Sequence, residues 1–240
     1  MKVELHCHTK YSHDSLLSHR LLYMKCVRKG IKYIAITEHN NLKGAQEFRE
    51  YCRNRGEKVH VIPGEEIMTS EGEVIGLYLK DEIPRDLSPE DTIDRIKQQG
   101  GIVYVPHPYD EKRYKTVLST DAIARNADSI DCIEAYNGRN ISPEYEIKQN
   151  EIAERFHARK VIGSDAHTLI EIGRNYLETD IGPDTREAFL SMLDNCAFVK
   201  APCIGVVHKV TKYARLIKLI GSGRFDEIHR IIVKRRGKNQ

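Results

Sequence analysis

The sequence of 240 residues predicts an α/β domain whose parallel strands close into a barrel, followed by a basic helical extension. Two observations favour this fold class. Short β-rich runs alternate with amphipathic helical stretches, as expected for parallel β/α units. Metal-binding types of residue follow nearly every predicted strand, and a barrel brings the carboxyl ends of all its strands to one mouth, whereas an open sheet spreads them along an edge.

Seven segments have the composition of strands, in the order Lys2–His6, Tyr33–Thr37, Val59–Ile62, Val74–Leu79, Ile102–Val105, Ile130–Tyr136 and Val161–Gly163. The stretch 72–79 is expected to return as the hairpin partner of the strand before it. No repeat, low-complexity segment or linker divides residues 1–204, so we expect one barrel domain over this range and a separate extension over 205–240.

Five helices are expected over Leu17–Arg28, Leu42–Arg55, Ser88–Gly100, Ser142–His157 and Asp184–Leu193. The first two are followed closely by Gly30 and Gly56, the residue type that most often ends a helix. Ser88 and Ser142 each precede a proline, a pattern typical of an N-cap followed by the first helical turn.

The composition limits the class of protein. With 40% hydrophobic and 30% charged residues, the chain is neither disordered nor fibrous. It contains no run of about 18 apolar residues and its first residues do not resemble a signal peptide, so we expect a cytoplasmic protein with no membrane partner. The scattered cysteines are interpreted as reduced thiols.

Charge is unevenly distributed along the chain. Residues 205–240 hold ten Lys and Arg against two acids, a net of +8, which leaves −5 for residues 1–204. A basic extension suggests a polyanion such as a short nucleic acid, and the alternative is a solvated helix face with a frayed tail. An apolar stripe over Val210–Ile220 is expected to dock on the barrel rather than on a membrane surface.

Six polar clusters at the strand ends indicate a metal site. They are His6–His8, Thr37–Asn40, Gly64–Glu66, Pro106–Pro108, Glu134–Asn137 and Gly163–His167. Alternation along a strand would direct His6 and His8 to one face. Imidazole and carboxylate together suit Mn, Fe or Zn, and adjacent divalent ions can polarise a phosphoryl oxygen and activate water. The alternative is a set of hydrogen-bonded polar residues in loops.

These motifs resemble the PHP (polymerase and histidinol phosphatase) metallophosphoesterases. The matching segments are Leu5–Ser15, Ile36–Asn40, Ile62–Ile67, Val105–Pro108 and Ile162–His167, so the resemblance extends from residue 1 to about 180. It implies a distorted seven-stranded TIM-like barrel with two or three divalent ions (Mn, Zn, Fe or Mg) at its mouth. It also implies hydrolysis of phosphate mono- or diesters.

The resemblance also implies a ligand set. One ion would be bound by His6, His8, Glu66 and Asp165, a second by Glu66 and His107, and a third by Asp14, His39 and His167. The family spacing selects Glu66 over Glu65. The Ser-x-Asp-Ser context favours Asp14 over His13, which would then be a surface neighbour or a proton donor behind the ligands.

The sequence departs from the family pattern in two places. Glu38 stands before His39 where most members have Asp, which affects the orientation of that histidine. No histidine occurs from 108 to 156, where some members supply a ligand to the second ion. Glu134, Asn137 or water would then hold that ion, or it would bind weakly.

Arg139 and Arg174 follow barrel strands and are candidates to bind a substrate phosphate, with local surface pairing as the alternative. Lys112 and Arg113 could add positive charge. We expect Glu66, Asp165 and His167 to carry the catalysis, with His167 or a water molecule protonating the leaving group.

Three functions remain open at this point. The first is metal-dependent hydrolysis of a small phosphorylated metabolite or nucleotide by an activated water. The second is an exonuclease on short oligonucleotides that uses the basic extension. The third is a non-catalytic RNA-binding barrel resembling a ribonuclease P protein subunit, against which the complete set of histidines argues.

Overall fold

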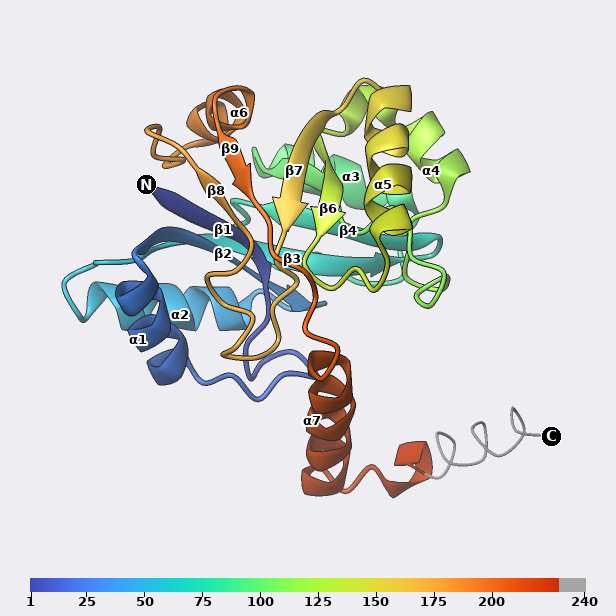
Figure 1. The fold of residues 1–240 in the computed structure, drawn as a ribbon. Helices are drawn as coiled ribbons and strands as arrows, with labels where there is room; N and C mark the ends of the chain where they lie inside the picture. Colours follow the sequence, from blue (N-terminus) through green and yellow to red (C-terminus); the bar gives the residue numbers. More distant parts are fainter. Residues whose placement is uncertain (229–240) are drawn as a thin grey trace.

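The computed structural model describes residues 1–228 (Figure 1). These residues form one sheet in the order β7-β6-β5-β4-β3-β2-β1-β8-β9. The strands are β1 (Lys2–Cys7), β2 (Ile31–His39), β3 (His60–Thr69), β4 (Gly72–Leu77), β5 (Ile102–Val105), β6 (Cys132–Asn137), β7 (Arg159–Gly163), β8 (Tyr176–Glu178) and β9 (Ala197–Val199). Most barrel strands pair in parallel, but β4 is antiparallel to both β3 and β5, which confirms the expected hairpin.

The sheet curls so that β7, at one edge, comes close to β1 and nearly closes the barrel. The Ser164 amide, just after β7, donates to the Leu5 carbonyl at 2.8 Å, and the His8 amide donates to the Ala166 carbonyl at 2.8 Å. The predicted distorted TIM-like barrel is therefore confirmed. The strand count differs from seven because β8 and β9, three residues each, extend the sheet beyond β1 with too short a pattern to predict.

The five predicted helices are present, with ends shifted by one or two residues. The helices are α1 (His19–Lys29), α2 (Lys43–Arg53), α3 (Pro89–Gln98), α4 (Thr120–Arg125), α5 (Pro143–Arg155), α6 (Arg186–Asp194) and α7 (Val207–Gly221). Ser88 caps α3 by accepting a hydrogen bond from the Asp91 amide. Ser142 occupies the same position before α5, but its side chain makes no capping bond, so that part of the prediction is wrong.

Alternation along the strands divides the core into two layers. Ile34 and Ile36 of β2 face outward and pack in one cluster with apolar residues of α1, α2 and α3. Tyr33 and Ala35 face inward and pack in a second cluster with residues of the other strands and of α6. Continuing the inward column of β2 toward its carboxyl end leads to His39. The barrel interior thus changes from apolar to polar toward the mouth.

Helix α7 lies beyond the mouth, and β6 and β7 run toward it in Figure 1. Val207, Ala214 and Leu219 are buried, and the Lys218 ammonium donates to the Lys10 carbonyl at 2.5 Å. The predicted docking of the stripe Val210–Ile220 is largely wrong, because most of its large apolar side chains face away from the barrel.

Residues 229–240 lie outside the described residues. They include His229 and half of the basic residues of the predicted extension, namely Arg230, Lys234, Arg235, Arg236 and Lys238. Among the helices of residues 1–228, none is long and apolar enough to cross a membrane.

Candidate metal centre

Glu66 lies at the centre of the polar cluster because the parallel register of β2 and β3 places it beside His39. Its Oε1 lies 3.2 Å from His6 Nε2 and 3.0 Å from His107 Nε2. Its Oε2 lies 3.4 Å from His8 Nε2 and 2.9 Å from His39 Nδ1. One buried carboxylate therefore contacts four imidazoles that come from three segments of the chain, at the ends of β1, β2 and β5.

Asp165 and His167 enter the cluster from the loop after β7. Asp165 Oδ1 lies 3.7 Å from the Nε2 atoms of both His6 and His8. Asp14 bridges the remaining side, with Oδ2 3.2 Å from His167 Nε2 and Oδ1 3.6 Å from a ring nitrogen of His39. All the residues in the expected ligand set thus lie in one cluster.

His13 and Asp14 both lie near His39, but their side chains are in different environments. Both belong to one group with His39 whose ligand atoms lie within 4.8 Å of one another. Asp14 is mostly buried between two imidazoles, whereas His13 is exposed, with its ring 4.8 Å from that of His39. Asp14 therefore points into the cluster and His13 lies on its rim.

The backbone at the mouth is irregular. His6, His107 and Asp165 have positive φ values of 64°, 29° and 49°, a conformation that is unfavourable for residues other than glycine. The register of β1 against β2 shifts between Glu4 and Cys7. His6 and His8 therefore meet through an irregularity at the end of β1 rather than through simple alternation, although the expected juxtaposition is present.

A layer of polar residues holds the imidazoles from behind. Glu134 Oε1 lies 2.7 Å from His6 Nδ1, and its Oε2 accepts the His107 amide at 2.6 Å and the Asn137 side-chain amide at 2.8 Å. Ser12 Oγ lies 2.9 Å from His8 Nδ1. Because Nδ1 of both rings is engaged, Nε2 faces the cluster centre, an arrangement that frequently fixes the ring of a metal-binding histidine.

Several ligand atoms at the centre make no well-formed hydrogen bond. Within the described residues these buried atoms are Nε2 of His6, His8 and His167 and Oε2 of Glu66, which lie 2.9–3.4 Å from a neighbouring carboxylate oxygen or imidazole nitrogen but in poor hydrogen-bond geometry. A buried polar atom without a partner costs about 1–3 kcal/mol. Several such atoms converging on one place fit a cation, and nitrogen with carboxylate oxygen is a donor set for borderline divalent metals.

Charge within the cluster also suits cations. Burial opposes ionisation of Glu66, but the neighbouring imidazoles, first that of His6, hold its pKa well below the usual value. Burial acts on Asp165 in the same way, and the Arg113 guanidinium and His6 hold its pKa well below the usual value. Burial and adjacent rings lower the pKa of His8. Burial opposes protonation of His6 and His39, but the neighbouring acids, first Glu66, raise the pKa of both well above the usual value. A bound metal ion would displace those protons, since metals bind the ionised carboxylate and the neutral imidazole.

Sequence reasoning missed Glu73 on β4. Its Oε2 lies 3.5 Å from His107 Nε2 and its Oε1 lies 3.7 Å from His39 Nδ1. Burial and the nearby Glu66 raise its pKa to about 7. The signal was present in the expected hairpin, since Ile75 pairs with Glu66 and Glu73 lies two residues farther along the same face.

The arginines occupy different environments from those expected. Arg113, considered only as a source of charge, places Nη1 2.5 Å from Asp165 Oδ2. Arg139 is buried and its Nε lies 3.0 Å from Glu171 Oε1. Arg174 donates to the Pro202 carbonyl at 2.9 Å. The phosphate-binding role of Arg139 and Arg174 stays a prediction, and each already has a protein partner.

Glu38 and Glu65 point away from the cluster. Glu38 accepts hydrogen bonds from the Thr9 amide at 3.0 Å and from Ser12 Oγ at 2.5 Å. The residue that departs from the family pattern therefore holds the loop that positions His8. Glu65 Oε2 accepts the Ile83 amide at 3.0 Å on the opposite side of β3 from Glu66.

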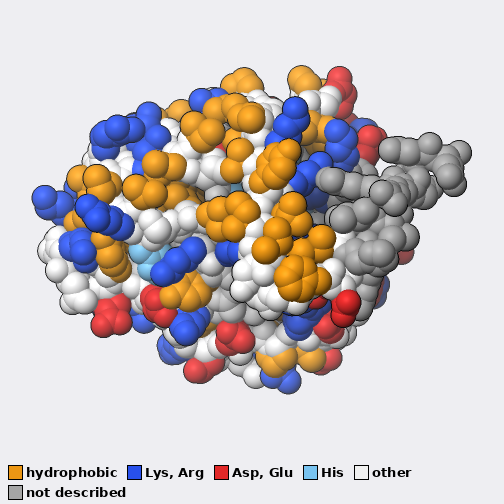
Figure 2. Space-filling view, turned by 90° about the horizontal axis from the view of Figure 1, so that it is seen from below, with side chains coloured by type: hydrophobic (Ala, Val, Ile, Leu, Met, Phe, Trp, Pro, Cys, Tyr) orange, Lys and Arg blue, Asp and Glu red, His pale blue; other side chains and the backbone are white. Residues whose placement is uncertain are grey.

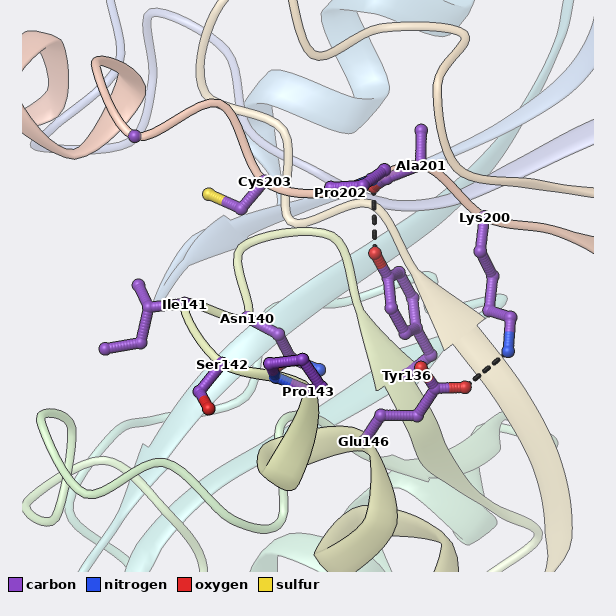
Figure 3. A pocket seen from close by; sticks show the side chains of 11 residues that line it. Tyr136, Asn140, Ile141, Ser142, Pro143, Glu146, Lys200, Ala201, Pro202 and Cys203 are labelled. Atoms are coloured by element: carbon purple, nitrogen blue, oxygen red, sulfur yellow. Dashed lines mark hydrogen bonds and ion pairs between the residues drawn. The ribbon is translucent and has the colours of Figure 1, made fainter.

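A hollow of about 410 Å³ lies between the start of α5 and residues 200–205 (Figure 3). Tyr136 forms one wall and donates to the Ala201 carbonyl at 2.8 Å, while Lys200 pairs with Glu146. None of the clustered histidines or acids lines this hollow. It is thus separate from the candidate metal centre, although Asn140 in its lining directly follows Arg139.

The sequence model of the PHP domain matches residues 4–227. The chain belongs to the PHP domain family. Two uncharacterized proteins of Methanocaldococcus jannaschii are similar to it. MJ1587 is 45% identical over 119 residues, which cover 45% of this chain and 68% of that protein. MJ0417 is 35% identical over 180 residues, which cover 74% of this chain and 70% of that protein.

A solved structure shows the same PHP fold. It is a two-domain protein of Bacteroides vulgatus that contains a predicted PHP-like metal-dependent phosphoesterase. The TM-score is 0.66 at 19% identity, covering 83% of this chain and 64% of the other. The present chain thus spans less than two thirds of that protein, and at this identity the likeness concerns the fold alone.

Proposed function

We propose that this PHP protein is a metal-dependent phosphoesterase that hydrolyses small phosphate esters with an activated water. One observation carries the proposal, namely the convergence of buried, unpartnered imidazole nitrogens and carboxylate oxygens on one place at the mouth of the barrel. Membership in the PHP family supports it.

Three adjacent groups of residues would hold the ions, and Glu66 belongs to two of them. His6, His8, Glu66 and Asp165 form the first group, Glu66 and His107 the second, and Asp14, His39 and His167 the third. Glu73 would contribute to the second group, in place of the family histidine that this sequence lacks. Divalent ions bound there would polarise a phosphoryl oxygen and make a bound water a better nucleophile.

The chain's own residues prepare this site for a phosphate. Glu134 and Ser12 hold His6 and His8 by Nδ1, so that Nε2 needs no rearrangement to bind. Arg113 adds a guanidinium beside Asp165 and would attract the phosphate and balance its charge. His167 or a water molecule would protonate the leaving group, and His13 lies exposed on the rim beside His39.

The substrate we propose is a small phosphorylated metabolite or a nucleotide. The exonuclease alternative needs the basic residues beyond 228, and it stays a prediction. A non-catalytic RNA-binding barrel would not need so many unpartnered donors in its interior.

The test is a substrate panel on the full chain reconstituted with Mn, Zn, Fe or Mg. It compares a phosphate monoester, a phosphodiester, nucleotides, histidinol phosphate and short RNA, with Asp165→Asn as the inactive reference. We expect metal-dependent hydrolysis of at least one monoester and loss of that hydrolysis in the variant. Failure on every ester with every metal, or equal rates for both proteins, would contradict the proposal.

A further inference from the structure

Helix α7 exposes a continuous apolar stripe. Tyr213, Ile217 and Ile220 are 65%, 54% and 52% exposed, and Val206 and Val210 extend the stripe toward the start of the helix. The intervals along the chain are four, three, four and three residues, which place all five side chains on one face. Large apolar side chains gathered in this way on a surface indicate a binding site.

The opposite face of α7 is already engaged with the barrel. Val207 and Ala214 are buried there, Arg139 Nη2 lies 3.3 Å from the Val207 carbonyl, and Lys218 reaches the Lys10 carbonyl at 2.5 Å. These contacts hold the helix in a fixed rotation. The stripe therefore faces outward while the docking contacts are intact.

The surroundings of the stripe are basic. Helix α7 contains Lys209, Lys212, Arg215 and Lys218 and no acid, and α1 likewise contains four Lys or Arg and no acid. Figure 2 looks at the molecule from the α7 side and shows apolar side chains gathered over α7, with further apolar and basic side chains toward α1. The whole segment 205–240 has a net charge of +8.

We propose that α7 binds the surface of an anionic lipid bilayer, with its stripe at the boundary between headgroups and acyl chains. An apolar helix face with basic residues around it is the composition of helices that lie in the plane of a membrane. Anionic headgroups complement the positive charge, at about 1 kcal/mol for each basic residue near the surface. This proposal reverses the expectation that the chain has no membrane partner.

Two other occupants fit the stripe less well. A second copy would bring two helices together that each carry basic residues and no acid. The phosphates of a nucleic acid would pair with the lysines, but they would make no apolar contact with aliphatic side chains such as Val210 and Ile217. An anionic bilayer satisfies both the charge and the apolar surface.

The experiment is co-sedimentation of the full chain with vesicles of phosphatidylcholine mixed with phosphatidylglycerol, compared with phosphatidylcholine alone. We expect the protein to pellet with the anionic vesicles, and high salt to release much of it. Ile217→Asp removes one apolar side chain that would be buried in the bilayer and should weaken binding about tenfold or more. Lys209→Gln combined with Lys212→Gln leaves the stripe intact and should weaken binding about thirtyfold.

Ile147→Asp is the matched control, because Ile147 on α5 is 57% exposed and is not part of the stripe. It should bind vesicles as the wild type does. No pelleting with anionic vesicles, or equal binding by Ile147→Asp and Ile217→Asp, would overturn the proposal. The proposal would also be overturned if the protein bound no vesicles and analytical ultracentrifugation showed a dimer that Ile217→Asp dissociates. Since these readouts do not involve hydrolysis, their failure is distinct from a failure of the proposed phosphoesterase activity.

Discussion

The barrel mouth and helix α7 depart from the usual burial pattern in opposite ways. At the mouth, ionisable side chains such as His6, Glu66 and Asp165 are at most 1% exposed. On α7, Tyr213 and Ile217 are more than half exposed. Ordinary folding favours the reverse in both places. Each departure therefore indicates a ligand that the fold itself does not supply, a cation in one case and a surface in the other.

The two regions differ in how firmly neighbouring residues hold their side chains in place. The mouth has a second layer, including Glu134 and Ser12, that fixes its side chains before any ligand arrives. The stripe on α7 has no such layer, since its side chains extend into solvent. A rigid, oriented site suits a small ion with demanding geometry, whereas a row of exposed apolar side chains suits a soft and extended partner.

The largest effect is expected at the mouth. His6→Ala should lower the rate of phosphate ester hydrolysis by a factor on the order of 10³ or more, because one ligand and its orientation are lost. Circular dichroism should show a folded protein. The matched control is His157→Asn, since His157 is exposed, lies outside the cluster and has a positive φ of 51° that Asn tolerates. Near wild-type hydrolysis by His6→Ala would contradict the assignment.

A smaller loss is expected from the layer behind the imidazoles. Glu134→Gln should weaken metal binding about 10–100-fold, because it removes the charge that orients His6 through Nδ1. Glu65→Gln changes a carboxylate that bonds to the Ile83 amide on the other side of β3, and it should leave metal affinity unchanged. Isothermal titration with Mn compares the two variants. Equal metal affinities of the two variants would show that the hold of Glu134 on His6 does not matter for metal binding.

Changing Arg139, which connects the two regions, should have a moderate effect on the stability of the fold. Arg139 joins Glu171 in the loop after β7 to the start of α7. Arg139→Lys keeps the charge but cannot reach all these partners, so we expect a loss of about 1–3 kcal/mol in the free energy of unfolding. Urea denaturation measures it. An unchanged midpoint would indicate that α7 docks independently of Arg139.

The smallest effect on stability is expected on the stripe. Ile217→Asp should change the free energy of unfolding by about 0.5 kcal/mol or less, because an exposed side chain loses little packing. The same denaturation experiment tests this. A loss of several kcal/mol would mean that Ile217 packs against the protein itself, and it would remove the contrast between the two regions.

The sequence predicted the barrel and the location of the cluster well because both follow from local patterns. Strand composition, helix-ending glycines such as Gly30 and short motifs such as His6–His8 are readable without contacts. Glu73 was missed because the hairpin of β3 and β4 was expected without its register, and the register is what pairs Ile75 with Glu66 and sets Glu73 two residues farther along the same face.

The arginines and α7 were harder to interpret for a related reason. Arg113 and Arg139 have similar chemistry, and only the folded chain shows that one contacts Asp165 and the other Glu171. The stripe on α7 was readable, but two faces of the helix carry apolar residues. Which face docks on the barrel depends on the shape of the mouth, so the sequence alone favoured the wrong one.

Anomalous diffraction from crystals grown with Mn tests the central claim most directly. We expect peaks inside the mouth of the barrel, one beside Glu66 and the Nε2 atoms of His6 and His8, and at least one more beside His107 or beside Asp14 and His167. A map with peaks only at surface carboxylates, while the cluster shows none, would contradict it.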